Sequence, residues 1–443
     1  MKSYFPYYKR ILLLAFPVML AQAGQVLVQQ VDNMMVGSVG TVELAAASFA
    51  GNIFIIGMVI GMGFTFGLTP LVGPAWASGD HKSAGQWLHN STILYAFIAL
   101  ILMILMYAVS FFMHRMGQDE QVAKLAIPYY RILVISMFPF MLFFGIKQFA
   151  EGIGNTIYAM TITLSANVVN IIFNYLFIFG KLGFPELGLT GAGYGTLIAR
   201  TAMPLMFIFI FFRKEIFKPY LTNIFQTRLD KKILKRLIEV GWPISAQIVL
   251  EVLAFALGAL MMGWLGPVPL AAHQIAIGLA SLTFMIVTGI AAGTTIRVSH
   301  QYNLGDYHSM KKATFASVHL VIGFMGTTAL IFYFLRDQFP LLYTTDKNVI
   351  IVASQLLIMA AIFQIFDGLQ VVMLGALRGL TDVKFAMIVA FISYILISLP
   401  LSYLLAFTLN WGPVGIWVGF VVSLALAGIL FLARFNYRSK ILS

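Results

Sequence analysis

The sequence has 443 residues, of which 60% are hydrophobic and 10% are charged, and its formal net charge is +12. Because soluble domains carry about a quarter charged residues, this composition excludes a soluble globular protein and predicts a polytopic membrane protein. The chain has no cysteine, which excludes disulfide bonds and thiol chemistry. Membrane topology explains the positive charge better than nucleic acid does, so we expect no nucleic-acid partner.

Apolar segments of about 20 residues, the length that a helix needs to cross roughly 30 Å of hydrocarbon, follow one another along the whole chain. The predicted spans are 11–36, 45–72, 90–113, 125–148, 157–179, 190–212, 236–260, 270–298, 314–335, 350–375, 384–407 and 414–435. The first span is too long for a signal-peptide core, so we expect it to be retained. The sequence therefore predicts an all-α membrane protein with twelve transmembrane helices.

Lysine and arginine gather in the loops of one side of the predicted membrane. They are frequent after the sixth and eighth spans and at both termini, whereas residues 37–44, 261–269 and 408–413 contain none. The basic residues of the N-terminus are Lys2, Lys9 and Arg10. By the positive-inside rule, both termini are predicted to lie in the cytoplasm.

The two halves of the chain repeat one pattern at an offset of 226 positions. Matching pairs are Pro17 with Pro243, residues 40–46 with 266–272, and Gly79-Asp80 with Gly305-Asp306. Six helices in each half give both halves the same orientation, which predicts a parallel repeat with the substrate path between the halves. We expect two pseudo-symmetric six-helix lobes, an N-terminal lobe (1–212) and a C-terminal lobe (236–443), joined by a cytoplasmic linker (213–235).

Three acids, Asp32, Glu251 and Asp367, fall inside predicted spans. A carboxylate at that depth costs roughly 2.5 to 3.5 kcal/mol on insertion scales, so a cation, a proton or a polar cavity must offset it. Glu251 follows Gln247 by one turn, and Asp367 lies between Gln364 and Gln370. The remaining acids fall in loops or at helix ends.

Glu251 and Asp367 both belong to the second half, so we expect them to share one cation or proton site. Two carboxylates in an apolar pocket repel each other unless a cation lies between them, which suits an ion-coupled carrier and makes this pair a candidate site for a cation or a proton. The alternative is a structural pairing with a buried basic residue. The candidates for such a pairing are Lys147, Arg200 and Arg297.

The first and fifth spans each carry a polar stripe. The stripes consist of Gln22, Gln25, Gln29 and Asp32, and of Asn167, Asn170 and Asn174. Spacings of three and four residues place each set on one helix face. We expect the first stripe to face a cavity, with interhelical hydrogen bonding as the alternative, and for the asparagines the two interpretations are equally supported. Asn170 and Asn174 are candidates to complete a site with Asp32.

No phosphate-binding loop, zinc-protease motif or hydrolase elbow occurs in the sequence, so we expect neither an enzyme nor a cofactor. The chain does resemble the MATE transporters (multidrug and toxic compound extrusion) over essentially its whole length. The segments that carry the resemblance are FPVMLAQ at 16–22, VDNMMVG at 31–37, LAAAS at 44–48, LAAHQIA at 270–276, the Gly-Asp pairs at 79–80 and 305–306, and GALRGLTD at 375–382. Glu251 and Asp367 look like the acids of the NorM-like branch.

The resemblance implies an antiporter that exports small organic cations in exchange for Na⁺ or H⁺, with two six-helix lobes around a V-shaped cleft. Glu251 and Asp367 would be the cation-site acids of the second lobe, and Asp32 with Asn170 and Asn174 would form the site of the first lobe. Gln25, Gln29, Gln247 and Gln364 would support these sites. We expect a monomer in contact with lipid in a bacterial plasma (inner) membrane.

Two alternatives stay open. One is a flippase of the same superfamily for a lipid-linked or anionic substrate, which would need buried basic residues in the cleft, and the predicted spans hold few. The other is a channel or a membrane-embedded enzyme. A channel would not need acids placed unequally in the two halves, and an enzyme would need a nucleophile or metal constellation that is not visible.

Overall fold

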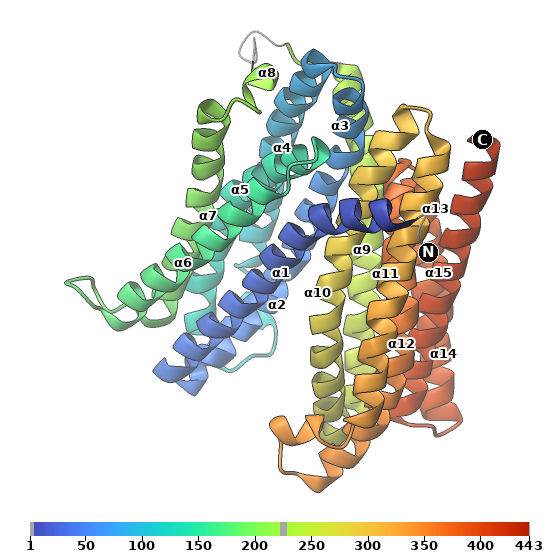
Figure 1. Cartoon of the computed structure of the whole chain (residues 1–443). Coiled ribbons are helices and arrows are strands. Elements are labelled where there is room, and N and C mark those ends of the chain that lie inside the picture. Colours follow the sequence, from blue (N-terminus) through green and yellow to red (C-terminus); the bar gives the residue numbers. More distant parts are fainter. Residues whose placement is uncertain (1–3, 222–227, 443) are drawn as a thin grey trace. The chain divides into compact units, whose positions relative to one another are not determined.

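The structure is a computed structural model that describes residues 4–221 and 228–442. Throughout these residues the chain forms helices joined by turns, and no strand occurs among them. Twelve helical stretches are long and apolar enough to cross a membrane, so the predicted fold class, an all-α polytopic protein with twelve transmembrane helices, is confirmed (Figure 1). Lys2 and part of the linker predicted at 213–235 lie outside the described residues.

The helices of the first half begin and end, in most cases, within one to three turns of the predicted spans. They are α1 (Phe5–Val39), α2 (Thr41–Phe66), α3 (Leu68–Ala77), α4 (His81–Val109), η2 (Met113–Arg115), α5 (Glu120–Gly152), α6 (Ile157–Phe179), α7 (Gly188–Arg213) and α8 (Lys218–Leu221). The largest difference is α4, which starts at His81 rather than at residue 90. The reason is that Asp80 caps this helix, so its first turns are polar and are not counted by hydropathy.

The second half has the same order of long helices. They are α9 (Lys231–Leu265), α10 (Pro267–Asn303), α11 (Tyr307–Phe334), η4 (Phe339–Leu342), α12 (Lys347–Gly379), α13 (Val383–Ala390), η5 (Phe391–Ser398), α14 (Leu399–Tyr403), η6 (Leu404–Thr408) and α15 (Pro413–Leu442). The eleventh span is interrupted by the π-helical turns η5 and η6. Pro400 lies just after η5 and has no backbone N–H to donate, which loosens the helical ladder there.

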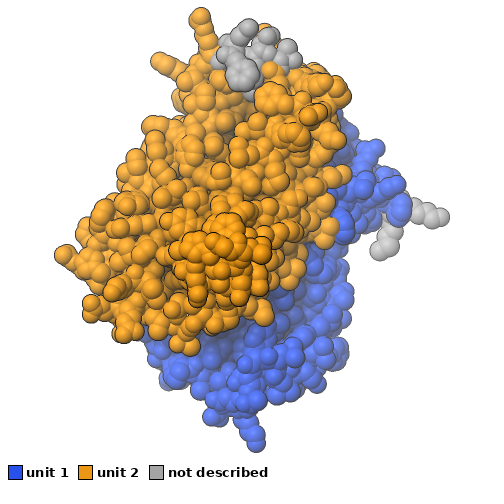
Figure 2. All heavy atoms as spheres, turned by 90° about the vertical axis from the view of Figure 1, so that its left-hand side faces the viewer, with its two compact units in different colours: residues 1–19, 246–443 blue, residues 20–245 orange. Residues whose placement is uncertain are grey.

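Figure 2 shows two compact units, residues 1–19 with 246–443 (unit 1) and residues 20–245 (unit 2). The division falls inside two continuous helices, between Met19 and Leu20 in α1 and between Ser245 and Ala246 in α9. Each of these helices therefore contributes to both units. The lobes predicted at 1–212 and 236–443 stay a prediction.

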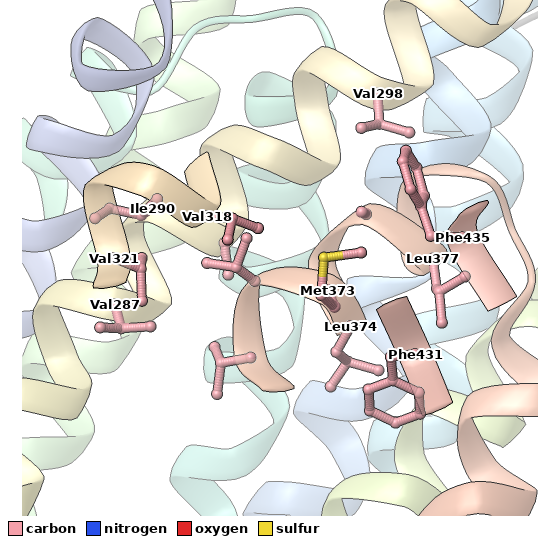
Figure 3. Close-up of a cluster of buried hydrophobic side chains, with 14 of the residues drawn as sticks. Val287, Ile290, Val298, Val318, Val321, Met373, Leu374, Leu377, Phe431 and Phe435 are labelled. Atoms are coloured by element: carbon pink, nitrogen blue, oxygen red, sulfur yellow. The ribbon is translucent and has the colours of Figure 1, made fainter. Parts of the chain in front are cut away.

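A single helix lies at the centre of each unit. In unit 2, α5 packs against α2, α3, α4 and α7, and its buried residues include Tyr130, Met137 and Met141. In unit 1, α12 packs against α10, α11 and α15. Figure 3 shows part of this second core, in which Leu374 and Leu377 of α12 lie among side chains of the neighbouring helices. Helix α12 also carries Asp367 and Arg378, two of the polar residues described below.

The internal repeat is visible in local geometry. Gly79 and Gly305 adopt left-handed backbone angles, with φ of 73° and 70°. The next residue in each case, Asp80 or Asp306, accepts a hydrogen bond of 3.0 Å from the backbone N–H of a serine three positions later. Two helices therefore start with the same glycine turn and the same carboxylate cap, as the pseudo-symmetry of the two halves predicts.

The shared helices α1 and α9 pack closely on small residues. A Cβ atom on Gly63 of α2 would lie 2.4 Å from the Cα of Ser245 in α9. A Cβ atom on Gly289 of α10 would lie 2.5 Å from the Cγ of Met19 in α1. Both pairs are related by the 226-residue offset, so the first half of α1 is held by α10 in the way that the first half of α9 is held by α2.

Candidate functional site

In unit 1, a line of hydrogen bonds runs from α12 to α9. Arg378 Nη2 donates to Gln247 Oε1 over 2.7 Å, and Gln247 Nε2 donates to Glu251 Oε2 over 2.8 Å. Gln247 and Glu251 are one helical turn apart, so both face α12. Arg378 also interacts electrostatically with Glu251. The amide of Gln247 therefore connects a guanidinium group to a carboxylate.

Asp367 of α12 belongs to the same group of polar side chains. Its side chain is buried, with 4% exposure, and it interacts electrostatically with Glu251 and with Tyr394 of η5. The structure thus brings together the two acids that the sequence assigned to one site, from helices more than 100 residues apart. Gln370, one turn after Asp367, is fully buried and lies beside Tyr394.

Gln364 has a supporting position. Its Oε1 accepts hydrogen bonds from Thr283 Oγ1 (3.1 Å) and Thr328 Oγ1 (3.3 Å). These threonines belong to α10 and α11, so Gln364 ties three helices together one turn before Asp367. We assign it to positioning α12 rather than to direct contact with an ion.

A second polar group lies in unit 2 around Asp32. Asn174 Nδ2 of α6 donates to Asp32 Oδ1 over 2.6 Å. With its amide turned so that the nitrogen faces the carboxylate, Asn170 donates to the same oxygen over 2.8 Å. Arg200 of α7 interacts electrostatically with Asp32 and donates from Nη1 to Ser136 Oγ over 2.9 Å. Asp32 is thus held by two amides and faces a guanidinium group.

The remaining residues of the first stripe are not part of this group. Gln25 is half-buried and Gln29 is exposed, and neither hydrogen-bonds to Asp32. The helical spacing correctly places them on the side of α1 that carries Asp32. It does not show how far along that face a neighbouring helix extends.

The basic partners differ from those expected. Lys147 lies 3.6 Å from Glu151 within α5, and both side chains are buried. Arg297 interacts with Asp306 and Tyr7 rather than with an intramembrane acid. The residue that faces Glu251 is Arg378. It lies in the segment GALRGLTD (375–382), but the sequence did not identify it as a partner of an acid. The reason is that Arg378 lies three residues beyond the predicted span 350–375, whereas α12 continues to Gly379.

These arrangements suit a small hard cation. The groups of unit 1 that face one another offer carboxylate, amide and hydroxyl oxygens, which are the ligands of such ions. Within residues 4–221 and 228–442, no group of three or more His, Asp or Glu side chains could hold a metal ion.

Comparisons with known proteins agree with this interpretation. A family model described as MatE matches residues 17–176 and 243–404. The multidrug resistance protein NorM of Photobacterium profundum is 33% identical over 437 residues, which cover 97% of this chain and 95% of that protein. The multidrug resistance protein MdtK of Pectobacterium atrosepticum is 31% identical over 445 residues, covering 99% and 97%.

Solved structures show the same fold. A multidrug resistance MATE family transporter in its outward-facing conformation gives a TM-score of 0.90 at 20% identity, covering 99% of this chain and 97% of that one. The MATE transporter VcmN of Vibrio cholerae in its bent form gives 0.87 at 18% identity, covering 100% and 99%. The chain therefore belongs to the MatE family, as a NorM-like member, and is a multi-pass membrane transporter of the multidrug efflux type and not an enzyme.

Proposed function

We propose that this chain is a secondary active antiporter that exports cationic amphipathic drugs in exchange for Na⁺ or H⁺. The observation that carries the proposal is the pair Glu251 and Asp367, two interacting carboxylates held in apolar helices. Buried acids without a matching number of cations are costly, so they bind and release a cation as part of a cycle. The relatives that are named multidrug resistance proteins support the substrate class.

The two lobes supply the movement. We assign them to residues 1–212 and 236–443, joined by the linker 213–235. Na⁺ or H⁺ binds at Glu251 and Asp367, and Asp32 with its asparagines serves as the corresponding site of the first lobe. Coupling follows from the different affinity of these sites for the cation in the inward-facing and outward-facing states.

The protein works as a monomer in the bacterial inner membrane, with both termini in the cytoplasm. Its partners are small organic cations and lipid. The distribution of basic residues supports the orientation, because they are frequent in the loop after the sixth helix and at both termini, on the side assigned to the cytoplasm.

Efflux of ethidium from reconstituted vesicles tests the proposal. An imposed Na⁺ gradient and an imposed pH gradient are applied separately to the native chain, Glu251→Gln, Asp367→Asn and Asp32→Asn. We expect one gradient to drive efflux and the second-lobe substitutions to reduce it at least about tenfold, since each removes a carboxylate whose charge contributes kilocalories to cation binding. The control is Asp337→Asn, whose side chain is 66% exposed and should leave efflux unchanged.

The outcomes distinguish Na⁺ coupling, H⁺ coupling and the absence of antiport. Efflux driven by Na⁺ alone and lost in both second-lobe variants assigns sodium coupling to Glu251 and Asp367. Efflux driven only by the pH gradient and lost chiefly in Asp32→Asn moves coupling to protonation in the first lobe. If neither gradient drives efflux and all variants behave like the native chain, the antiport proposal is wrong.

A flippase for an anionic or lipid-linked substrate remains the second candidate. The observation in its favour is that Arg200 and Arg378 lie within the membrane-spanning helices, where the sequence led us to expect few basic residues near the acids. Both arginines interact with carboxylates, which favours the antiporter. Transfer of a fluorescent anionic lipid between leaflets, independent of any ion gradient, would favour the flippase.

A further inference from the structure

Arg378 of α12 reaches the two acids of unit 1 through Gln247. It lies eleven residues after Asp367 on α12, which is three helical turns and places both on one face. Helical side chains point toward the N-terminus of their helix, so Arg378 reaches back toward Asp367. Its guanidinium donates a hydrogen bond to Gln247, and the amide nitrogen of Gln247 donates one to Glu251. The order along the group is therefore Arg378, Gln247, Glu251 and Asp367.

Gln247 is well suited to relay a charge. Its carbonyl oxygen can only accept and its amide nitrogen can only donate, so the guanidinium fixes one end and the carboxylate fixes the other. Hydrogen bonds to charged groups are stronger than neutral ones, and a chain of them polarises cooperatively. Gln247 is 1% exposed, so water does not compete for either end. The positive charge of Arg378 therefore stabilises the negative charge of Glu251. The charged group that acts on Asp367 is Glu251 and not Arg378.

The formal charges of this group decide which ion it suits. Two carboxylates and one guanidinium sum to one negative charge. In an apolar setting the neutral state is favoured, because each uncompensated charge is costly. One monovalent cation brings the sum to zero, whereas a divalent cation leaves one positive charge. With Arg378 absent, the sum would be two negative charges, which a divalent cation would neutralise.

The internal repeat argues against a merely structural role for this arrangement. At the offset of 227 that relates Gly152 to Gly379, Arg378 corresponds to Glu151, and at 226 Glu251 corresponds to Gln25. Glu151 pairs with Lys147 within its own helix. The two halves share their helix order and caps but not this line of side chains. A feature that the scaffold required would be expected in both halves.

We propose that Arg378 is a positioning residue that sets the charge of the cation site: through Gln247 it neutralises Glu251, leaves Asp367 as the principal cation ligand, and makes the site select one monovalent ion over a divalent ion. This inference rests on the proposed antiport function, since it assumes that Glu251 and Asp367 bind the coupling cation. It adds the selectivity of that site and the residue that produces it.

Binding of radioactive calcium to the full-length protein in lipid nanodiscs, at mildly alkaline pH, tests the proposal. We expect the native chain to exclude Ca²⁺ and Arg378→Gln to bind it about tenfold or more tightly, because one compensating charge at short range is worth at least that factor. Arg378→Lys keeps the charge and should exclude Ca²⁺ as the native chain does. The double variant Arg378→Gln with Glu251→Gln again has a formal site charge of one negative, as in the native chain. It should therefore not show the tighter Ca²⁺ binding of Arg378→Gln.

Gel filtration and thermal melting show first whether each variant is folded. If folded Arg378→Gln gains no Ca²⁺ binding, or if Arg378→Lys gains as much, the proposal is overturned. Should Arg378→Gln fail to fold, Gln247→Met decides, because it removes the relay and keeps both charged partners. In that case we expect Gln247→Met to bind Ca²⁺ more tightly than the native chain does. If the folded variant excludes Ca²⁺ as the native chain does, the proposal is overturned.

The result can be distinguished from a failure of the proposed function. Ethidium efflux under ion gradients tests antiport, while the gain of Ca²⁺ binding tests only the charge of the site. If native efflux ignores every gradient but Arg378→Gln binds Ca²⁺, antiport falls and the role of Arg378 stands. If efflux follows a gradient and no variant binds Ca²⁺, antiport stands and this inference is wrong.

Discussion

At the scale of single residues, three arrangements offset the free-energy cost of burying a carboxylate. Asp32 is held by amide donors and faces Arg200, Glu251 faces Arg378 through Gln247, and Glu151 pairs with Lys147 in its own helix. An unpaired charge in the membrane would cost several kilocalories per mole, so each of these three acids has a polar or basic partner, in its own helix or in a neighbouring one. At the proposed cation site this compensation is incomplete, because the charged group that acts on Asp367 is another acid, Glu251.

Outside the membrane-spanning helices, carboxylates act as helix caps. Asp306 accepts hydrogen bonds from the backbone and side chain of Ser309, which hold the pKa of its carboxyl below the usual value. Asp80 is held the same way by Ser83, whose side-chain and backbone hydrogen bonds lower its pKa. A depressed pKa in the folded state means that the cap stabilises at neutral pH. This stabilisation is lost as the pH falls through the lowered pKa.

We therefore expect Asp306→Ala to lower the free energy of unfolding by about 1 kcal/mol at neutral pH, because it removes the N-cap of α11. The difference from the native chain should shrink as the pH falls below the ordinary range of a carboxyl and through the lowered pKa of Asp306, because the protonated group no longer caps the helix as a carboxylate. Thermal melting in detergent across this pH range provides the measurement. Asp306→Ser is the control, since a serine caps without titrating and should show little dependence on pH. A constant deficit of Asp306→Ala at every pH would contradict the argument.

At the scale of helices, glycines set where two helices meet most closely. The backbone of α9 occupies the space that a Cβ on Gly63 would need, as Met19 of α1 does for Gly289. The proline of each shared helix, Pro17 or Pro243, lies two residues before the point where the chain passes between the compact units. Close packing and a weakened backbone ladder thus occur side by side in α1 and in α9.

Gly63→Ala should destabilise the protein by about 1 to 3 kcal/mol, because the new methyl group overpacks against Ser245. Gly323→Ala is the matched control: a Cβ there meets nothing within 4 Å, and alanine favours a helix more than glycine does. We expect it to be neutral or slightly stabilising. Thermal unfolding of the purified variants gives the comparison. Equal effects of the two substitutions would mean that helix propensity, and not close packing, governs Gly63.

At the scale of the whole molecule, twelve spans place both termini on one side of the membrane, and the basic loops predict which side. Because the chain has no cysteine, single introduced cysteines report their exposure without background. Glu215 and Asp337 are suitable positions, with side chains 84% and 66% exposed. They lie in loops that the topology assigns to opposite sides.

A membrane-impermeant maleimide applied to intact cells should label Asp337→Cys and leave Glu215→Cys unlabelled until the cells are permeabilised. The expected contrast is large, because each site is either in contact with the reagent or separated from it by the bilayer. The native chain serves as the blank. The reverse pattern would invert the orientation, and labelling of both in intact cells would contradict the odd number of spans, three, that separates the two positions.

The sequence by itself determined the features that the bilayer imposes. A lipid environment requires about twenty apolar residues per helix, and a charged side chain within it must be compensated. The spans, the internal repeat and the acids Asp32, Glu251 and Asp367 can therefore be found without a structure. Family resemblance added the transporter assignment, which the comparisons confirm. The polar start of α4 was missed because hydropathy does not register a capped helix beyond the membrane.

Only the tertiary structure decided which side chains meet. Spacing along one helix shows which residues share a face, but not which helix that face contacts or at what height. For this reason Asn174 could be suggested as a neighbour of Asp32, 142 residues away, while Arg378 was not paired with Gln247, 131 residues away. The charge that we propose for the cation site depends on that second contact, because Gln247 alone lies between Arg378 and the carboxylate of Glu251.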